Sequence, residues 1–344
     1  MAKRQNYILG LGPAALAAGS VAPFPVIADH GNDRLAFYAT AVKNEQYRRQ
    51  LNPGWTNGPS ARRAFQFFTR GLSWLTKPNP AGLEFIRRHT SIVKVARRTD
   101  RLATINTHGG LELGDCHYED NCYFLAQPAR LAQHLEASCR VLNDVPIAIN
   151  LSSRTIEFKR HALPFEHIIS ALPLSDVTIL TNLKVWRQPY VQVLNLSYRA
   201  PVKGWIHAER VLIEGTGRFH LVDEIGFYAN VAGDYAPVES TCNHFAISVR
   251  HNVRDVAELL GQAAFKANVI TELMYYGFDV THNECCEYNL VRENQATMGG
   301  PSRTELLESL AQSGVYQVGS LGRAVEQSLD LDILEGLSTG AALV

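Results

Sequence analysis

The first strand and turn constrain the fold of this chain more than any other stretch. Residues 7–9 form an apolar run, and Gly10 and Gly12 follow it directly before a run of small helix-forming residues. Gly10 permits a tight turn. Gly12 has no side chain, so a phosphate group is able to approach the backbone where a helix begins. Ala15 stands at the third glycine position, where only close helix–strand packing is required. The stretch predicts a dinucleotide-binding turn.

A second short apolar strand supports this interpretation. It spans Pro25–Ala28 and ends at Asp29, 19 residues after Gly10. An acid at the end of the second strand, about 20 residues after the glycines, is typical of a ribose-binding carboxylate. The alternative is a secretory signal peptide, since Lys3 and Arg4 precede an apolar run. Gly-x-Gly-Pro is a poor apolar core for such a signal, and no membrane-spanning run follows it.

Length and composition set broad limits on the class of protein. A chain of 344 residues suits two intertwined domains better than one. No stretch approaches the 18 or more uninterrupted apolar residues of a membrane helix. The six cysteines form no C-x-x-C pair, which favours a reducing, cytoplasmic setting over a disulfide framework, and no Cys/His spacing indicates a metal site. The vicinal pair Cys285-Cys286 is either redox-active or simply two small buried residues.

The net charge of zero conceals a strongly basic segment. Lys43–Arg101 holds thirteen Lys and Arg residues against three acids, a local balance of +10. Arginine suits bidentate phosphate binding, and aromatic residues between the cations suit nucleotide bases. The alternative is a solvated basic face over a helical core, because Phe65, Phe68 and Leu72 recur at helical spacing. The predicted phosphate-binding residues come from three arginine pairs: Arg48, Arg49, Arg62, Arg63, Arg87 and Arg88.

The rest of the chain alternates between helical and strand patterns. Four successive segments, at 190–198, 204–215, 218–230 and 243–250, are spaced too closely for crossover helices, so we expect an antiparallel sheet. We also expect helices at 33–51, 60–75, 81–89, 254–275 and 303–313, a helix from Pro128, a strand at 91–97, and a terminal helix beginning near Asp332. Ser302 and Glu305 have the spacing of a capping box for the helix at 303–313.

Four segments in order resemble the flavoprotein superfamily that contains amine oxidases, protoporphyrinogen oxidase and UDP-galactopyranose mutase. They are Gly10–Ala14, a helix followed by Val141–Val145, the run Phe165–Pro173, and Val315–Gly319 continued by Gly322-Arg323 and Asp332–Gly336. The run Phe165–Pro173 is very similar to the "yDhvIsalP" strand of that superfamily. Together these segments cover about a third of the chain.

The resemblance implies an α/β fold with a Rossmann-like, FAD-binding domain of the glutathione-reductase type. This domain would be discontinuous, formed by residues 1–42, 102–175 and 300–344. Interleaved with it would be a substrate domain of antiparallel sheet plus helices, made of a basic helical insert at 43–101 and a sheet at 176–299.

The resemblance also implies a set of FAD contacts. The first turn, with Pro13 and Ala14 beside its glycines, would lie against the pyrophosphate, Asp29 near the adenosine ribose, and Val145 against the adenine. Gly319 and Ser320 would border the ribityl chain and phosphates, and the amides of a helix N-terminus would approach the pyrimidine end of the flavin. Two departures are visible: Ser320 stands where an acid or Arg is common, and a Gly-Gly doublet is missing after Asp29. The implied cofactor residues are Gly10, Gly12, Pro13, Ala14, Asp29, Val145, Gly319, Ser320, Asp332, Ile333 and Leu334.

The function implied is an FAD-dependent oxidoreductase that oxidises a C–N bond of an amine or amino-acid-like group. The basic segment predicts an anionic partner, either a phosphate-bearing small molecule or a nucleic-acid-linked substrate such as a modified DNA base. Two alternatives stay open: a redox-neutral flavin enzyme acting on a nucleotide-sugar, as in the mutase, and a non-catalytic nucleotide- or nucleic-acid-binding protein that has lost the flavin. Candidates for the catalytic face are Tyr228, Asn230 and Arg323, with Tyr198 and His244 beside them.

Overall fold

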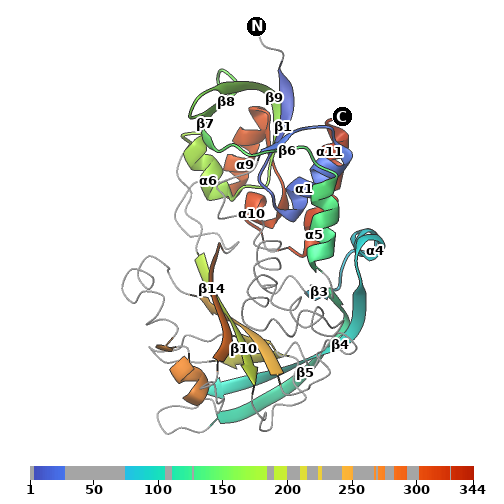
Figure 1. Cartoon of the computed structure of the whole chain (residues 1–344), viewed down its shortest axis with the longest axis vertical. Helices are drawn as coiled ribbons and strands as arrows, with labels where there is room; N and C mark the ends of the chain where they lie inside the picture. The colour runs from blue at the N-terminus through green and yellow to red at the C-terminus, as the bar shows by residue number, and fades with distance from the viewer. Residues whose placement is uncertain are drawn as a thin grey trace.

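The computed structural model of the chain describes residues 4–27, 74–104, 111–125, 128–183, 190–199, 210–214, 224–226, 242–250, 267–268, 270–275, 283–292, 302–325 and 327–344. Two sheets organise these residues (Figure 1). The first sheet and its helices lie in the upper half of the view, together with both ends of the chain, and the second sheet lies in the lower half.

The first sheet is built around β1 (Gln5–Leu9), which pairs in parallel with β2 (Val26–Ile27) and β9 (Ala162–Ser170). Parallel pairing continues to β6 (Val141–Leu142) beyond β2 and to β15 (Val315–Gln317) beyond β9. The first half of β9 also pairs in antiparallel fashion with β8 (Thr155–Phe158), which pairs with β7 (Pro146–Asn150). The parallel strands therefore end at one shared edge, and β7 and β8 extend the sheet on the side of β9.

Helices cover both faces of this sheet, which explains why β1 is apolar on both faces. Ile8 belongs to one core cluster, whereas Tyr7 and Leu9 belong to the other. The cluster around Ile8 also contains residues of α1 (Pro13–Val21), α4 (Pro80–His89), α5 (Pro128–Ala137) and α11 (Leu329–Ala342). The opposite cluster contains residues of α6 (Leu174–Leu180) and α9 (Arg303–Gln312).

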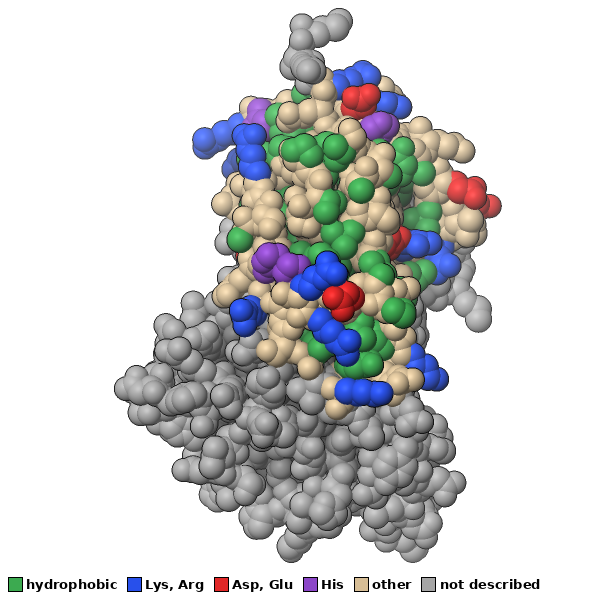
Figure 2. Space-filling view, turned by 90° about the vertical axis from the view of Figure 1, so that its right-hand side faces the viewer, with side chains coloured by type: hydrophobic (Ala, Val, Ile, Leu, Met, Phe, Trp, Pro, Cys, Tyr) green, Lys and Arg blue, Asp and Glu red, His purple; other side chains and the backbone are tan. Residues whose placement is uncertain are grey.

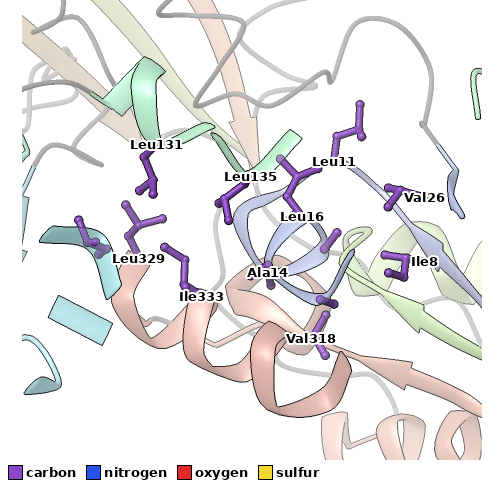
Figure 3. Packing of buried hydrophobic residues seen from close by; sticks show 14 of the residues in the cluster. Ile8, Leu11, Ala14, Leu16, Val26, Leu131, Leu135, Val318, Leu329 and Ile333 are labelled. Carbon is purple, nitrogen blue, oxygen red and sulfur yellow. The ribbon is translucent and has the colours of Figure 1, made fainter. Parts of the chain in front are cut away.

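Glycines allow α1 and α11 to pack at very short range. A Cβ added at Gly336 would lie 2.0 Å from the carbonyl oxygen of Ala14, and one at Gly340 would lie 2.7 Å from that of Ala18. Gly336 and Gly340 are four residues apart on α11, and Ala14 and Ala18 are four residues apart on α1. Each of these two pairs therefore lies along one face of its helix. Figure 3 shows Ala14 of α1 and Ile333 of α11 within the same cluster. We call this contact the α1–α11 seam.

The second sheet contains eight strands in the order β14-β10-β13-β12-β11-β4-β5-β3. All its neighbours are antiparallel except β11 and β4, which run in parallel. Its strands are β3 (Trp74–Thr76), β4 (Ile92–Thr104), β5 (Leu111–Leu125), β10 (Tyr190–Arg199), β11 (Arg210–Glu214), β12 (Glu224–Gly226), β13 (Cys242–Arg250) and β14 (Asn283–Arg292).

Most of the elements expected from the sequence are present where the structure describes them. β10, β11, β12 and β13 confirm the antiparallel sheet, and α4, α5 and β4 confirm the helices at 81–89 and from Pro128 and the strand at 91–97. Ser302 and Glu305 form both hydrogen bonds of the predicted capping box. The predicted helix at 33–51 and residues 60–73 of the helix at 60–75 lie outside the described residues. The last two residues of the helix predicted at 60–75, Trp74 and Leu75, belong to β3 instead. Residues 267–268 and 270–275 are helical within the predicted helix at 254–275.

The division of the chain differs from the expectation in several places. α4 and most of α6 pack on the first sheet, although residues 43–101 and 176–299 were assigned to the substrate domain. Residues 102–125 were assigned to the domain of the first sheet, but β4 and β5 pair with each other from Ile92–Leu125 to Thr104–Leu111 and belong to the second sheet. The reason is that β4 continues beyond Arg101 without a break and then pairs in parallel with β11. In the described part of the chain, no helix has the length and apolar character needed to cross a membrane.

Candidate cofactor-binding site

The shared edge at which the parallel strands end brings the predicted cofactor residues together. Gly10 and Gly12 follow β1, Val145 follows β6, and Gly319 and Ser320 follow β15. In α/β sheets of this kind, ligands bind at the carboxyl ends of the strands. We therefore consider this edge the candidate site.

The turn between β1 and α1 has the geometry that its sequence predicts. Gly10 has a φ of +93°, a conformation that L side chains rarely adopt, and its amide donates to the Ile27 carbonyl oxygen at 3.0 Å. Gly12 is the N-cap of α1, and Pro13 is the first helical residue, where its missing N–H is not needed.

Gly12 lies at an open position at the start of α1. A Cβ added at Gly12 would meet only the Ala171 Cβ, at 3.9 Å, so the position is open rather than filled by packing. The amides of Ala14 and Ala15 belong to the first turn of α1 and have no acceptor within the helix. These amides and the helix dipole favour an anion at this end of α1. The residues of this turn are therefore suited to a dinucleotide pyrophosphate.

Ala14 also holds the turn against the C-terminal elements. Its side chain is buried, and its methyl group would lie 2.9 Å from a Cβ at Gly319, the first residue of α10 (Gly319–Arg323). Gly319 has a φ of +75°. The start of α10 therefore lies directly beside the first turn of α1.

The first amides of α10 are bound to carboxylates of α11. The Gly319 amide donates to Glu335 Oε2 at 2.9 Å, and the Ser320 amide donates to Asp332 Oδ1 at 2.7 Å. The Ser320 hydroxyl donates to Asp332 Oδ2 at 3.1 Å. Gln327 donates to both carboxylates, and Arg323 pairs with Glu335 at 2.8 Å. These amides, which were expected to border the ribityl chain and phosphates, thus have partners within the chain.

Burial of Asp332 changes its acidity. Only 7% of the residue is exposed. Burial raises the pKa of the Asp332 carboxyl from 3.8 to about 6, the hydrogen bonds from Gln327 and Ser320 oppose this rise, and the negative charge of Glu335 adds to it. A carboxylate in this position is costly in its charged form, and its donors offset part of that cost.

The prediction that the amides of Asp332, Ile333 and Leu334 form a helix N-terminus at the flavin is wrong. α11 begins at Leu329 with Ser328 as its N-cap, so the Asp332 amide donates to the Ser328 carbonyl oxygen at 3.0 Å. The amides of Ile333 and Leu334 lie inside the helix, where each donates to the carbonyl oxygen four residues earlier. The N-terminus of α11 therefore lies at Leu329, about one turn before Asp332.

Val145 lies at the expected strand end, but its amide has a partner. It donates to Asp144 Oδ1 at 2.8 Å, and Asp144 Oδ2 lies 3.5 Å from His161 Nε2. The remaining candidates fall into two groups. Arg323, predicted to be catalytic, forms a salt bridge with Glu335 and lies on the exposed side of α10. Several candidates lie outside the described residues: Asp29, Arg48, Arg49, Arg62, Arg63, Tyr228 and Asn230.

Arg87 and Arg88 lie in the last turn of α4, and both are exposed. The Arg87 guanidinium carbon lies 5.5 Å from the centroid of the Tyr123 ring, and Arg88 Nε lies 3.2 Å from Glu84 Oε1. Figure 2 shows Lys and Arg side chains gathered around few acidic ones on the lower part of the described surface. Both arginines are thus available at the surface.

Sequence reasoning missed the roles of Glu335 and Gln327. The signal that was present is the spacing of Asp332 and Glu335, since residues three apart on a helix share a face. Their partners lie on α10, and only the tertiary structure shows which residues face them. Among the described residues, no group of three His, Cys, Asp or Glu side chains is suitably placed to hold a metal ion.

The fold and the site define a class: an α/β protein with a dinucleotide-type turn at the end of its first parallel strand and a second, largely antiparallel sheet. No protein-family model and no curated protein matches the sequence. Solved structures do match, over nearly the whole chain.

Three of these structures illustrate the match. Reduced UDP-galactopyranose mutase is 12% identical with a TM-score of 0.59, covering 99% of this chain and 93% of that one. A protein from Exiguobacterium sp. 255-15, assigned as a protoporphyrinogen oxidase, is 9% identical with a TM-score of 0.62, covering 100% and 99%. Putrescine oxidase bound to putrescine is 11% identical with a TM-score of 0.57, covering 99% and 98%. The chain has the fold of the superfamily that its motifs resemble.

Proposed function

We propose that this chain binds FAD and acts as an oxidoreductase of the amine-oxidase kind. The observation that carries the proposal is the open position at Gly12, directly before the free amides of α1, in a chain that shares its fold with putrescine oxidase over 99% of its length. The first sheet would be the FAD-binding domain of the glutathione-reductase type, and the second sheet would face the substrate. The inference from fold to activity is one of analogy.

In this proposal the first turn of α1 binds the pyrophosphate through the amides of Ala14 and Ala15, and Gly12 allows its close approach. Asp29 binds the adenosine ribose, and Val145 lies against the adenine. Bound FAD would supply the hydride acceptor for oxidation of a C–N bond of an amine or amino-acid-like group. The protein would orient that group and exclude water, with Tyr228 and Asn230 as the candidate catalytic side chains.

The substrate we propose carries phosphate, either as a small molecule or as part of a nucleic acid with a modified base. The support is the balance of +10 over Lys43–Arg101 and the exposure of Arg87 and Arg88 at the end of α4. Basic side chains beside aromatic rings suit phosphates and bases together, and Arg87 over Tyr123 is one such pair.

Two other functions have specific support. The similarity to UDP-galactopyranose mutase favours a redox-neutral flavin enzyme acting on a nucleotide-sugar. The bonds from Gly319 and Ser320 to carboxylates of α11 favour a non-catalytic protein that has lost the flavin.

Titration of the purified chain with FAD tests the proposal. We expect near-stoichiometric binding with flavin absorption bands for the wild type, and at least about tenfold weaker binding for Gly12→Ala, whose methyl group would stand where the pyrophosphate approaches. Gly12→Ala will fold, because its Cβ meets only Ala171 Cβ at 3.9 Å. Thr304→Ala, on the exposed face of α9, is the control and binds like the wild type.

Colourless wild-type protein that takes up no added FAD would refute the proposal and leave the non-catalytic alternative. If FAD binds and turnover of a nucleotide-sugar requires reduced flavin without net oxidation, the mutase-like function replaces the oxidase. Equal FAD affinity of Gly12→Ala and the wild type would show that the α1 turn is not the pyrophosphate site.

A further inference from the structure

Two carboxylates of α11 occupy the amides at the β15–α10 end of the candidate site. Glu335 accepts from the Gly319 amide, and Asp332 accepts from both the amide and the hydroxyl of Ser320. The proposed function requires anionic phosphates at the same edge of the sheet. The chain therefore places its own negative charge beside the position where it would bind that of a dinucleotide.

We propose that Asp332 and Glu335 form a carboxylate latch that closes the β15–α10 end of the site to phosphate, so that dinucleotide binding competes with the latch. This inference rests on the proposed binding of FAD. The latch consists of Asp332 and Glu335 on α11, Gly319 and Ser320 on α10, and Gln327 between the two helices.

The hydrogen bonds of the latch satisfy each partner without any ligand. Hydrogen bonds from amides to a carboxylate are charge-assisted and stronger than those between neutral groups. Gln327 Nε2 donates to Asp332 and, at 3.1 Å, to Glu335, so it holds the two carboxylates together. Arg323 is the cation paired with this group, and 45% of its side chain is exposed. Phosphate oxygens would have to replace carboxylate oxygens at the same amides.

Ser320 contributes a second donor to the latch. Its hydroxyl donates to Asp332 Oδ2 at 3.1 Å, beside the bond from its amide to Asp332 Oδ1. Ser320 therefore binds both carboxylate oxygens of Asp332.

Gly319, the first residue of α10, places the latch beside the first turn of α1. Gly319 would meet Ala14 at 2.9 Å through an added Cβ, and the same added atom would lie 3.7 Å from the Asp332 carboxylate. Ala14 in turn contributes one of the free amides of α1. The latch carboxylates thus lie beside the turn that is proposed to bind pyrophosphate. Their negative charge would repel the negative charge of the pyrophosphate.

The test compares two ligands in two variants. FAD and riboflavin are titrated by flavin fluorescence into the full chain carrying Asp332→Asn and Glu335→Gln together, and into Glu335→Gln alone in case the double variant does not fold. We expect the affinity for FAD to rise about tenfold, the effect of about 1.4 kcal/mol, while that for riboflavin, which has no phosphate, is unchanged. Glu308→Gln on α9 removes an exposed charge elsewhere and is the matched control, with wild-type affinity for both ligands.

Hydrogen exchange of the Gly319 and Ser320 amides provides a readout without any ligand. These amides are protected in the wild type and in Glu308→Gln, and both lose protection in Asp332→Ala with Glu335→Ala, which removes the acceptor oxygens. Unchanged protection in this alanine variant would overturn the latch, as would an unchanged or lower FAD affinity of the Asp332→Asn, Glu335→Gln double variant. An equal gain for FAD and riboflavin would overturn the competition for phosphate.

The outcomes separate the two proposals. If no variant binds FAD, the proposed function fails and so does the gating of a cofactor by the latch, while hydrogen exchange still decides whether the carboxylates hold α10. If the wild type and Glu308→Gln bind FAD as tightly as the double variant, the proposed function stands and the latch is refuted.

Discussion

Replacement of Asp332 by Asn is expected to stabilise the protein at neutral pH and to leave it unchanged near pH 4. The pKa of the Asp332 carboxyl rises from 3.8 to about 6 on folding. The folded state therefore binds the proton more tightly than the unfolded state, and the free energy of unfolding decreases as pH rises through this window. The difference of about 2 pKa units corresponds to about 3 kcal/mol in the free energy of unfolding. This contribution is lost once the Asp332 carboxyl is ionised, above about pH 6.

Asparagine imitates the protonated acid without losing its partners. Its Oδ1 accepts from the Ser320 amide and from Gln327, as Asp332 Oδ1 does, and its amide group is placed to donate to the Ser320 hydroxyl in place of the present bond. The variant should therefore be more stable than the wild type by up to about 3 kcal/mol at pH 7.5, with the difference vanishing near pH 4.

Urea unfolding at pH 4, 5, 6 and 7.5 measures this effect for the wild type, Asp332→Asn and Glu308→Gln. Glu308 is exposed on α9, so its replacement should give no pH-dependent gain. A variant that is less stable than the wild type at pH 7.5, or a difference that does not change with pH, would refute the reasoning that the buried carboxylate is held at a cost.

Two further changes test the seam and the basic surface. Gly336→Ala brings a methyl group within 2.0 Å of the Ala14 carbonyl oxygen, so α1 and α11 must separate; we expect a loss of about 3 kcal/mol or more in thermal unfolding, and none for the exposed Ser338→Ala. Arg87→Glu with Arg88→Glu should weaken binding of a labelled single-stranded oligonucleotide and make its logarithmic salt dependence less steep by about 1.4, whereas the exposed pair Lys159→Glu with Arg160→Glu should not. Stability of Gly336→Ala equal to that of Ser338→Ala, or equal effects of the two charge reversals, would contradict these expectations.

The features that the sequence predicted well are local ones. The turn after β1 depends on Gly10, Gly12 and Pro13, which are neighbours in the chain, and their backbone demands are visible in residue type alone. The antiparallel sheet that contains β10, β11, β12 and β13 was expected from successive strands at close spacing. The capping box of α9 needs only Ser302 and Glu305.

The features that the sequence did not reveal depend on distant partners. β4 joins the second sheet because it pairs in parallel with β11, from Thr99–Arg210 to Ala103–Glu214, and no local pattern predicts such a pairing. The start of α11 was placed too late because the apolar Leu329 precedes Asp332 without a side-chain cap at Ser328. The bond between Asp332 and Ser320 joins two helices, so its effect on acidity appears only in the folded chain.

The α1–α11 seam has a consequence for how the chain is made. Residues 22–328 are synthesised between the two helices. At roughly 5–20 residues per second, α1 waits on the order of half a minute for its partner. During this time the small apolar face around Ala14 and Ala18 lacks the helix that covers it in the folded chain. The packing of the first turn of α1 is therefore completed only after α11 has been made.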